Sequence, residues 1–281
     1  MRGFRALVSG LSAAAFVVSA GLAQAPVPGG ATAPSAQAPA GGRGQQAAPL
    51  PPALLDCLEL SAALRGVANN DARLRDWPQL GRYREANRTA GSVDVVFLGD
   101  SITDSWPQER FGPFFPGKKY VGRGISAQTT PQMLVRLRPD VLNLKPKAVV
   151  ILAGTNDIAG NTGPMTDEEI QGNLASMSEL AKVAGVKVVL SSITPTSAYH
   201  VNPNGVPQTT TRPLARIRAM NDWMKNYAAK NGHFYLDYFS AMVDSTGVMK
   251  AEYTADDLHP NAAGYAVMAP LAQAAIDKAI R

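Results

Sequence analysis

The sequence predicts an α/β protein: a three-layer α/β/α sandwich around a central, mostly five-stranded parallel sheet. Two observations support this prediction. Apolar residues occur in short unbroken blocks, which is typical of parallel strands that are covered on both faces. Stretches with helical spacing of apolar residues lie between these blocks, and strands that alternate with helices favour a parallel sheet with helices on both sides.

The apolar blocks predict where the strands lie. They cover residues 93–98, 119–121, 148–153, 186–193 and 233–238. In an open parallel sheet, reactive groups gather at the carboxyl ends of the strands. The residues that directly follow these blocks are therefore the first candidates for a functional site.

Three longer helices are predicted from apolar residues at spacings of three and four. One begins at Pro131, because proline suits the first turn of a helix, and Pro139 is expected to break or kink it. A second follows a capping box formed by Thr166 and Glu169, and a third follows Pro213. The inward faces are Met133, Leu134 and Leu137; Ile170, Leu174, Met177 and Ala181; and Leu214, Ile217, Met220, Met224 and Tyr227.

Residues 1–25 have the features of a signal peptide. Arg2 and Arg5 precede the apolar run "ALVSGLSAAAFVVSA", which is too short to span a bilayer comfortably, and residues 23–25 offer an A-x-A cleavage site. Cleavage before Gln24 is a competing position, and an uncleaved membrane anchor is the alternative interpretation. We predict export to the periplasm or the medium, with no stable membrane insertion once the signal is removed.

A linker and one domain are predicted to follow. Residues 26–52 consist largely of Ala, Pro, Gly and Gln with a single charge, at Arg43, so they have too little apolar surface to fold and form a flexible linker. We predict one folded domain over residues 53–281. The only cysteine, Cys57, has no partner for a disulfide within the chain and is expected to be a small buried apolar residue.

The basic character of the chain is concentrated at its N-terminus. The formal net charge is +5, but residues 1–50 contain three arginines and no acid, which leaves +2 for the rest. No run of Lys or Arg occurs, so nucleic-acid binding is not predicted. His200 and His233 have no other ligand at zinc spacing, and no phosphate-binding glycine motif is present, so neither a metal nor a cofactor is predicted.

Polar residues follow the predicted strands at positions where they can meet. Ser101 lies just beyond the first strand in "GDSIT", Asn156 follows the third block in "GTND", and Asp256 and His259 occur in "DDLHP" before the last helix. Taken singly, these residues suit an N-cap serine, a turn asparagine and a capped surface turn. Their combination in one chain favours a shared site at one edge of the sheet.

The four blocks "GDSIT", "GRGISAQTT", "GTND" and "DDLHP" together resemble the SGNH superfamily of GDSL-type esterases and lipases over nearly the whole predicted domain. The resemblance implies a flavodoxin-like α/β/α hydrolase that uses no cofactor. It implies that Ser101 is the nucleophile, His259 the general base and Asp256 the residue that orients the histidine. It also implies an oxyanion hole formed by Asn156 and by the backbone N–H groups of Ser101 and Ala127.

The chain departs from the family pattern at several positions. In the second block, the usual asparagine position holds Gly122 and the usual glycine position holds Ala127. An alanine keeps the backbone N–H, but it costs free energy if φ is positive there, and Gly124 is the alternative donor. Asp257 stands where the family more often has glycine, and we expect it to be solvated.

Ester chemistry accounts for these residue types. A neutral hydroxyl attacks an ester carbonyl slowly, so Ser101 needs a base within about 2.6–3.2 Å. A neutral His259 can accept that proton, and an acid three residues upstream can reach its other ring nitrogen within one turn. Asp100 and Asp157 are expected to hold loops by accepting backbone hydrogen bonds.

The predicted function is that of an exported serine hydrolase that cleaves carboxylic acyl esters. Acetyl or other short acyl groups are favoured because no long lid segment occurs. The expected substrate is a small acyl ester, with acylated carbohydrates and lysolipids as candidates. Two alternatives stay open: an acyltransferase that passes the acyl group to a sugar or lipid hydroxyl, and a non-catalytic carbohydrate-binding module on the same fold.

The aromatic residues after the first block have two interpretations. They are expected to pack in the core under the first helix, and the alternative is an apolar wall for the acyl group. The residues concerned are Trp106, Phe111, Phe114 and Phe115.

Overall fold

The computed structural model describes residues 75–200 and 205–281. The predicted signal peptide, the predicted linker and Cys57 therefore lie outside the described residues. No helix within the described part of the chain is long and apolar enough to cross a membrane.

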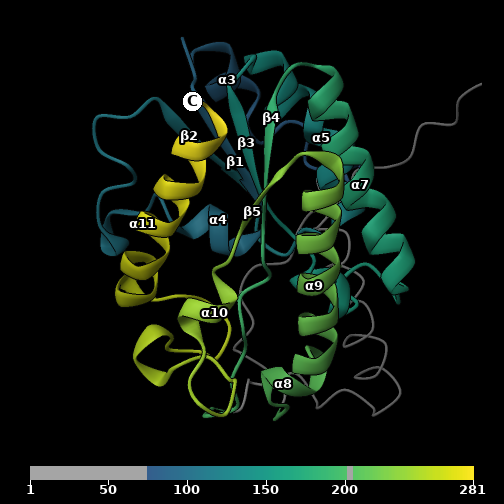
Figure 1. The fold of residues 1–281 in the computed structure, drawn as a ribbon, viewed down its shortest axis with the longest axis vertical. Helices are drawn as coiled ribbons and strands as arrows, with labels where there is room; N and C mark the ends of the chain where they lie inside the picture. Colours follow the sequence, from purple (N-terminus) through teal and green to yellow (C-terminus); the bar gives the residue numbers. More distant parts are fainter. Residues whose placement is uncertain (1–74, 201–204) are drawn as a thin grey trace, which may run out of the picture. The chain divides into compact units, whose positions relative to one another are not determined.

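The sheet has five strands, all parallel, in the order β2-β1-β3-β4-β5 (Figure 1). The strands are β1 (Val95–Gly99), β2 (Tyr120–Gly124), β3 (Ala148–Leu152), β4 (Lys187–Ser191) and β5 (Phe234–Leu236). Each overlaps one of the predicted apolar blocks. Gly99 pairs with both Gly124 and Leu152, so the carboxyl ends of three adjacent strands are level with one another.

Helices cover both faces of this sheet, which confirms the predicted three-layer fold (Figure 1). The longest are α5 (Thr130–Asp140), α7 (Asp167–Val183), α9 (Leu214–Asn231) and α11 (Ala262–Ala279). The shorter ones are α3 (Arg84–Arg88), α4 (Ser101–Ser105), α6 (Thr155–Ile158), α8 (Gln208–Thr211) and α10 (Phe239–Met242), with single 3₁₀ turns at Glu109–Phe111, Leu142–Leu144 and Ala251–Tyr253.

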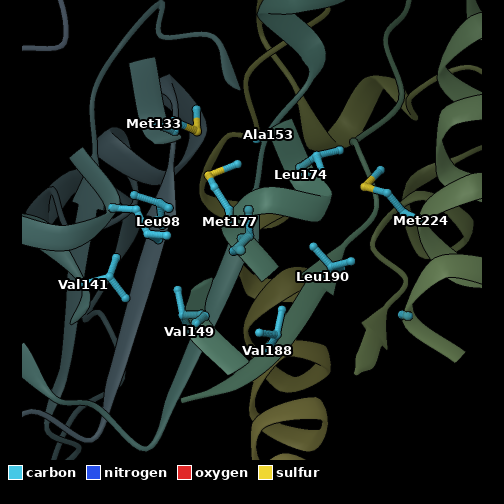
Figure 2. Close-up of a cluster of buried hydrophobic side chains, with 14 of the residues drawn as sticks. Leu98, Met133, Val141, Val149, Ala153, Leu174, Met177, Val188, Leu190 and Met224 are labelled. Atoms are coloured by element: carbon cyan, nitrogen blue, oxygen red, sulfur yellow. The ribbon is translucent and has the colours of Figure 1, made fainter. Parts of the chain in front are cut away.

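Alternate residues of the strands pack into two separate cores. Side chains such as Leu98 and Val149 point toward α5, α7 and α9, where they meet Met133, Leu174 and Met224 (Figure 2). On the other face, strand residues including Phe97 and Val150 pack against α4 and α11. Because both faces are covered, every residue of β1 and of β3 is buried, which explains their unbroken apolar sequences.

The predicted helix signals agree with the observed helix ends. Thr166 and Glu169 form the predicted capping box of α7, in which each side chain accepts a hydrogen bond from the other residue's backbone N–H. Pro139 lies inside α5, and the helix ends one residue later at Asp140. The proline thus marks the end of the helix rather than a kink within it.

Candidate active site

Ser101 lies where the chain turns from β1 into α4. Gly99 ends the strand, and Asp100 caps the helix by accepting a hydrogen bond from the Ile102 N–H at 3.0 Å. Only glycine fits at position 99, because a Cβ there would lie 2.1 Å from Thr103 Oγ1. This tight turn places Ser101 as the first residue of α4, half-buried at the carboxyl edge of the sheet.

His259 faces Ser101 from the loop before α11. Its Nε2 lies 2.9 Å from Ser101 Oγ, and its Nδ1 lies 2.6 Å from Asp256 Oδ2. Asp256 Oδ1 also accepts hydrogen bonds from the N–H groups of His259 at 2.7 Å and Leu258 at 3.1 Å. The structure therefore brings together three side chains from opposite ends of the described domain.

The loop that carries Asp256 and His259 is closed at its base. Thr254 pairs with Pro260 in an isolated antiparallel bridge, and its hydroxyl donates to the His259 carbonyl oxygen at 2.9 Å. Asn261 then caps α11 by accepting a hydrogen bond from the Gly264 N–H at 3.1 Å. These contacts fix the loop between two defined points, so the side chains of Asp256 and His259 share one rigid support.

The charge of Asp256 decides which nitrogen of His259 carries the proton. Burial alone would raise the pKa of Asp256, but the side-chain and backbone hydrogen bonds from His259 outweigh it and hold the pKa well below its usual value. An ionised carboxylate only accepts hydrogen bonds, so His259 Nδ1 must donate to it. In the neutral ring, Nε2 is then free to accept the proton of the Ser101 hydroxyl.

A cavity of about 630 Å³ opens at this edge of the sheet. Its walls include Ser101, His259, Asn156, Ala127, Phe111 and Arg212. Gly124, the alternative donor, is not among the lining residues; it is buried in β2, and its carbonyl oxygen accepts a hydrogen bond from the Tyr83 hydroxyl. Between the two candidates, only Ala127 lies at the cavity.

Asn156 lies in the first turn of α6, directly after β3, and is 3% exposed. Its Nδ2 donates to the Gln128 carbonyl oxygen at 3.0 Å, and its Oδ1 accepts from Arg212 Nη2 at 3.3 Å. An amide nitrogen carries two hydrogens, so one N–H of Asn156 remains for a ligand in the cavity.

Ala127 adopts a left-handed backbone conformation, with φ of 66°. For a residue with a Cβ, this conformation costs about 1–2 kcal/mol. Its carbonyl oxygen accepts a hydrogen bond from Asn161 Nδ2 at 3.3 Å, while its N–H has no hydrogen-bond partner in the part of the chain that the structure describes. The conformation thus leaves a backbone donor available beside the cavity.

A buried arginine supports the loop that contains Ala127. Arg136, on α5, donates to the carbonyl oxygens of Gly99 and Arg123, each at 2.8 Å, and to the side chain of Gln128. Gln128 in turn donates to the Pro78 carbonyl oxygen at 2.7 Å. One side chain therefore links the ends of β1 and β2 to the loop, a role that no local sequence pattern indicated.

Asp100 and Asp157 hold loops in the way the sequence predicted. Asp100 accepts from the Ile102 N–H, and Asp157 accepts from the Thr130 N–H at 2.8 Å. Burial is the main cause that raises the pKa of Asp100 to about 6, and the nearby Asp157 carboxylate acts in the same direction. The second carboxyl oxygen of each acid has no hydrogen-bond partner among the described residues.

The expectation that Asp257 is solvated was wrong. The residue is fully buried and left-handed, with φ of 68°. Its carboxylate accepts hydrogen bonds from the Ser197 hydroxyl, from the Tyr199 N–H at 3.2 Å and from the His200 N–H at 2.6 Å. These partners lie about 60 positions earlier in the chain, so the neighbouring sequence could not reveal them.

The aromatic residues after β1 divide between the two predicted roles. Trp106 and Phe115 are buried and pack against Phe97, with ring centroids 5.7 and 5.0 Å away. Phe111 instead lines the cavity, where the Arg110 guanidinium lies 4.6 Å from its ring centroid. Within the described residues, no group of three or more potential metal ligands occurs.

Comparisons with known proteins agree with this fold. Residues 97–267 match the model of the GDSL-like lipase/acylhydrolase family. A provisionally assigned acylhydrolase from Bacteroides fragilis NCTC 9343 is 41% identical, with a TM-score of 0.66 over 73% of this chain and 99% of that chain. A GDSL-like lipase from Bacteroides thetaiotaomicron is 37% identical, with a TM-score of 0.65 over 72% and 98%.

A mutant of an acetylxylan esterase from Geobacillus stearothermophilus shares the fold at 21% identity, with a TM-score of 0.53 over 66% of this chain and 95% of that chain. Among proteins of curated function, none matches significantly. The fold and the family match define an acyl ester hydrolase. The chain belongs to the GDSL-like lipase/acylhydrolase family, which confirms the predicted superfamily and enzyme class.

Replacement of Ala127 by glycine tests the strain at this position. Glycine adopts positive φ without steric cost, so we expect Ala127→Gly to raise the free energy of unfolding by up to about 1 kcal/mol in urea denaturation. Ala219→Gly, at an exposed position inside α9, is the control and should lower it by about 1 kcal/mol. Equal destabilisation by both changes would contradict the assigned strain.

Asp100→Asn should gain stability relative to the wild-type protein as the pH rises from about 4 to 7. The pKa of Asp100 is about 6 in the folded protein against 3.8 in the reference state, so the folded state binds more protons in this window and loses stability as Asp100 ionises. The difference in the free energy of unfolding between Asp100→Asn and the wild-type protein should grow by about 3 kcal/mol over this pH range. Urea denaturation at several pH values measures it, with the exposed Asp222→Asn as control; a constant difference would contradict the assignment.

Proposed function

We propose that this protein cleaves small carboxylic acyl esters with Ser101 as nucleophile, His259 as general base and Asp256 as the residue that orients His259. One observation carries the proposal: His259 Nε2 lies 2.9 Å from Ser101 Oγ, while Nδ1 lies 2.6 Å from Asp256 Oδ2. Both are hydrogen-bond distances, and the first places Ser101 Oγ within reach of proton transfer to His259. Membership of an acylhydrolase family supports the same reaction class.

In the proposed acylation step, Ser101 Oγ attacks the ester carbonyl carbon as its proton passes to His259 Nε2. The carbonyl oxygen becomes an oxyanion, and Asp256 stabilises the imidazolium that forms. The carbon–oxygen bond to the alcohol then breaks, and His259 returns the proton to the leaving alcohol. The products of this step are a free alcohol and an ester between the acyl group and Ser101.

The proposed oxyanion hole has three donors. They are the backbone N–H groups of Ser101 and Ala127 and one N–H of the Asn156 side chain. All three residues line the cavity, and the Ala127 N–H is not used by other described residues. Loss of a single donor of this kind typically lowers kcat by about 10² to 10³.

Deacylation repeats the same steps with a second nucleophile. Water gives up a proton to His259 and attacks the acyl-enzyme, which releases the acid and restores Ser101. A sugar or lipid hydroxyl in place of water would make the protein an acyltransferase. Addition of such an alcohol to the assay distinguishes the two, because a transferase converts it to the new ester in preference to hydrolysis.

Short acyl groups suit the proposed site. The lining residues of the cavity include the polar and charged side chains of Ser105, Arg110 and Asn161, and the large apolar side chains among them are Phe111 and Leu258. An acetyl group needs little apolar surface, whereas a long acyl chain would have to lie along these polar groups.

We further propose that the protein acts after export. A mature protein whose N-terminal residue is Met1 would contradict this proposal.

Ser101→Ala should abolish ester cleavage. Without the hydroxyl no acyl-enzyme forms, so we expect kcat for p-nitrophenyl acetate to fall by at least about 10³. Ser105→Ala is the matched control, because Ser105 lies on the same helix and lines the same cavity. It should retain activity within about fivefold. Turnover by Ser101→Ala at the wild-type rate would remove Ser101 from its role, whereas a wild-type protein without ester cleavage would favour a binding module.

Replacement of Asp256 by asparagine should preserve the fold but lower kcat by about 10² to 10⁴, because an amide can donate to His259 Nδ1 and so favour the wrong tautomer. The control is Asp257→Asn, which changes the adjacent acid. That residue is buried and contacts backbone N–H groups of another loop, so its loss should reduce the denaturation midpoint and leave kcat within about tenfold. If Asp257→Asn lowered kcat strongly and Asp256→Asn did not, Asp257 rather than Asp256 would be the residue that orients His259.

A further inference from the structure

Arg212 lines the cavity and is 8% exposed. It lies between α8 and α9, directly before Pro213. We infer that Arg212 is a positioning residue for ester cleavage: it fixes the side-chain amide of Asn156 in the orientation that presents an N–H to the oxyanion. The inference rests on the proposed function and assigns a residue that touches neither the nucleophile nor the base in the described contacts.

The guanidinium of Arg212 is held on several sides. Nη2 donates to Asn156 Oδ1 at 3.3 Å, and Nε donates to Thr155 Oγ1 at 3.2 Å. Nη1 donates to Gln208 Oε1 at 2.7 Å and to Thr211 Oγ1 at 3.2 Å. These bonds use four of its five N–H groups, so the planar side chain has one defined orientation.

The two contacts of Asn156 are of opposite kinds, and together they define which way its amide faces. Arg212 offers only donors, so it requires the oxygen of Asn156 on its side. The Gln128 carbonyl offers only an acceptor, so it requires the nitrogen on the other side. A flipped amide would bring two donors together at Arg212 and two acceptors together at Gln128, which disfavours that orientation.

The positive charge of Arg212 is not cancelled by a direct ion pair. Within the described residues, no carboxylate lies within 4.0 Å of its guanidinium nitrogens. Burial lowers the pKa of Arg212, whereas the more distant carboxylates of Asp100 and Asp256 act in the opposite direction, and arginine remains charged in proteins. A charged donor polarises the Asn156 amide and so strengthens the N–H that faces the cavity.

Arg212 also has structural contacts, so a simple loss of activity would not establish this role. Its carbonyl oxygen accepts from Thr196 Oγ1 at 3.3 Å, and its side chain ties α8 to the start of α6. A double-mutant cycle separates the two roles. If Arg212 acts through Asn156, replacement of Arg212 should lower kcat only in a protein that still contains Asn156.

The experiment compares kcat and KM for p-nitrophenyl acetate in Arg212→Met, Asn156→Ala and the double variant. We expect Arg212→Met to lower kcat about 10- to 100-fold and to change KM less than about threefold. In the Asn156→Ala background, the same change should lower kcat less than about threefold. Multiplicative losses in the double variant, or a kcat within threefold of wild type for Arg212→Met, would overturn the inference.

Two further variants control for folding. Arg216→Met removes a matched arginine that bonds Asp167 and the Met165 carbonyl outside the cavity, and it should leave kcat within about threefold. Should Arg212→Met fail to fold by circular dichroism, Arg212→Lys replaces it, with Arg216→Lys as its control. Lysine keeps the positive charge but loses the planar fork of donors, so Arg212→Lys should lower kcat and Arg216→Lys should leave it within about threefold. Equal effects of the two changes would overturn the inference.

Ser101→Ala in the same assay separates this inference from the proposed function. An inactive Ser101→Ala with an unaffected Arg212→Met would reject the role of Arg212 alone. An active Ser101→Ala would reject the proposed nucleophile, and the inference with it.

Discussion

The hydrogen bond between Ser101 and His259 joins residues that are 158 positions apart, and the site depends on it. The parallel sheet makes it possible, because level strand ends at Gly99 and its neighbours bring the following loops to one edge. A second contact fixes the two supporting helices, since the hydroxyl of Tyr265 on α11 donates to the Ile102 carbonyl oxygen on α4 at 2.7 Å. Ser101 and His259 are therefore held by the same packing that closes one of the two cores.

Two buried arginines hold the loops at this edge of the sheet. A buried carbonyl group needs a hydrogen-bond donor, and leaving it without one is costly. Arg136 donates to the carbonyl oxygens of Gly99, the last residue of β1, and of Arg123 in β2, while Arg212 donates to side chains at the start of α6. The polar side chains beside the cavity are therefore part of the hydrogen bonding that stabilises the fold at this edge.

Sequence patterns predicted most of the fold because strands and helices are local. The apolar blocks indicated all five strands, and the capping box of Thr166 indicated where α7 begins. The sequence motifs also indicated Ser101 and His259 as candidate site residues. The roles of Arg136 and Arg212 escaped prediction because the contacts that define them are distant in sequence. Gly99 lies 37 positions from Arg136 and Asn156 lies 56 positions from Arg212, and no spacing rule connects them. Asp257 was misjudged for the same reason: its acceptor oxygens are satisfied by a distant loop.

The order of Ser101 and His259 along the chain has a consequence for biosynthesis. Translation produces Ser101 well before His259 and α11, the helix that follows it. A nascent chain that does not yet include residue 259 thus contains Ser101 without the hydrogen-bond partner of the folded domain. On the proposed mechanism, such a chain cannot cleave esters until His259 is made and α11 has packed against α4.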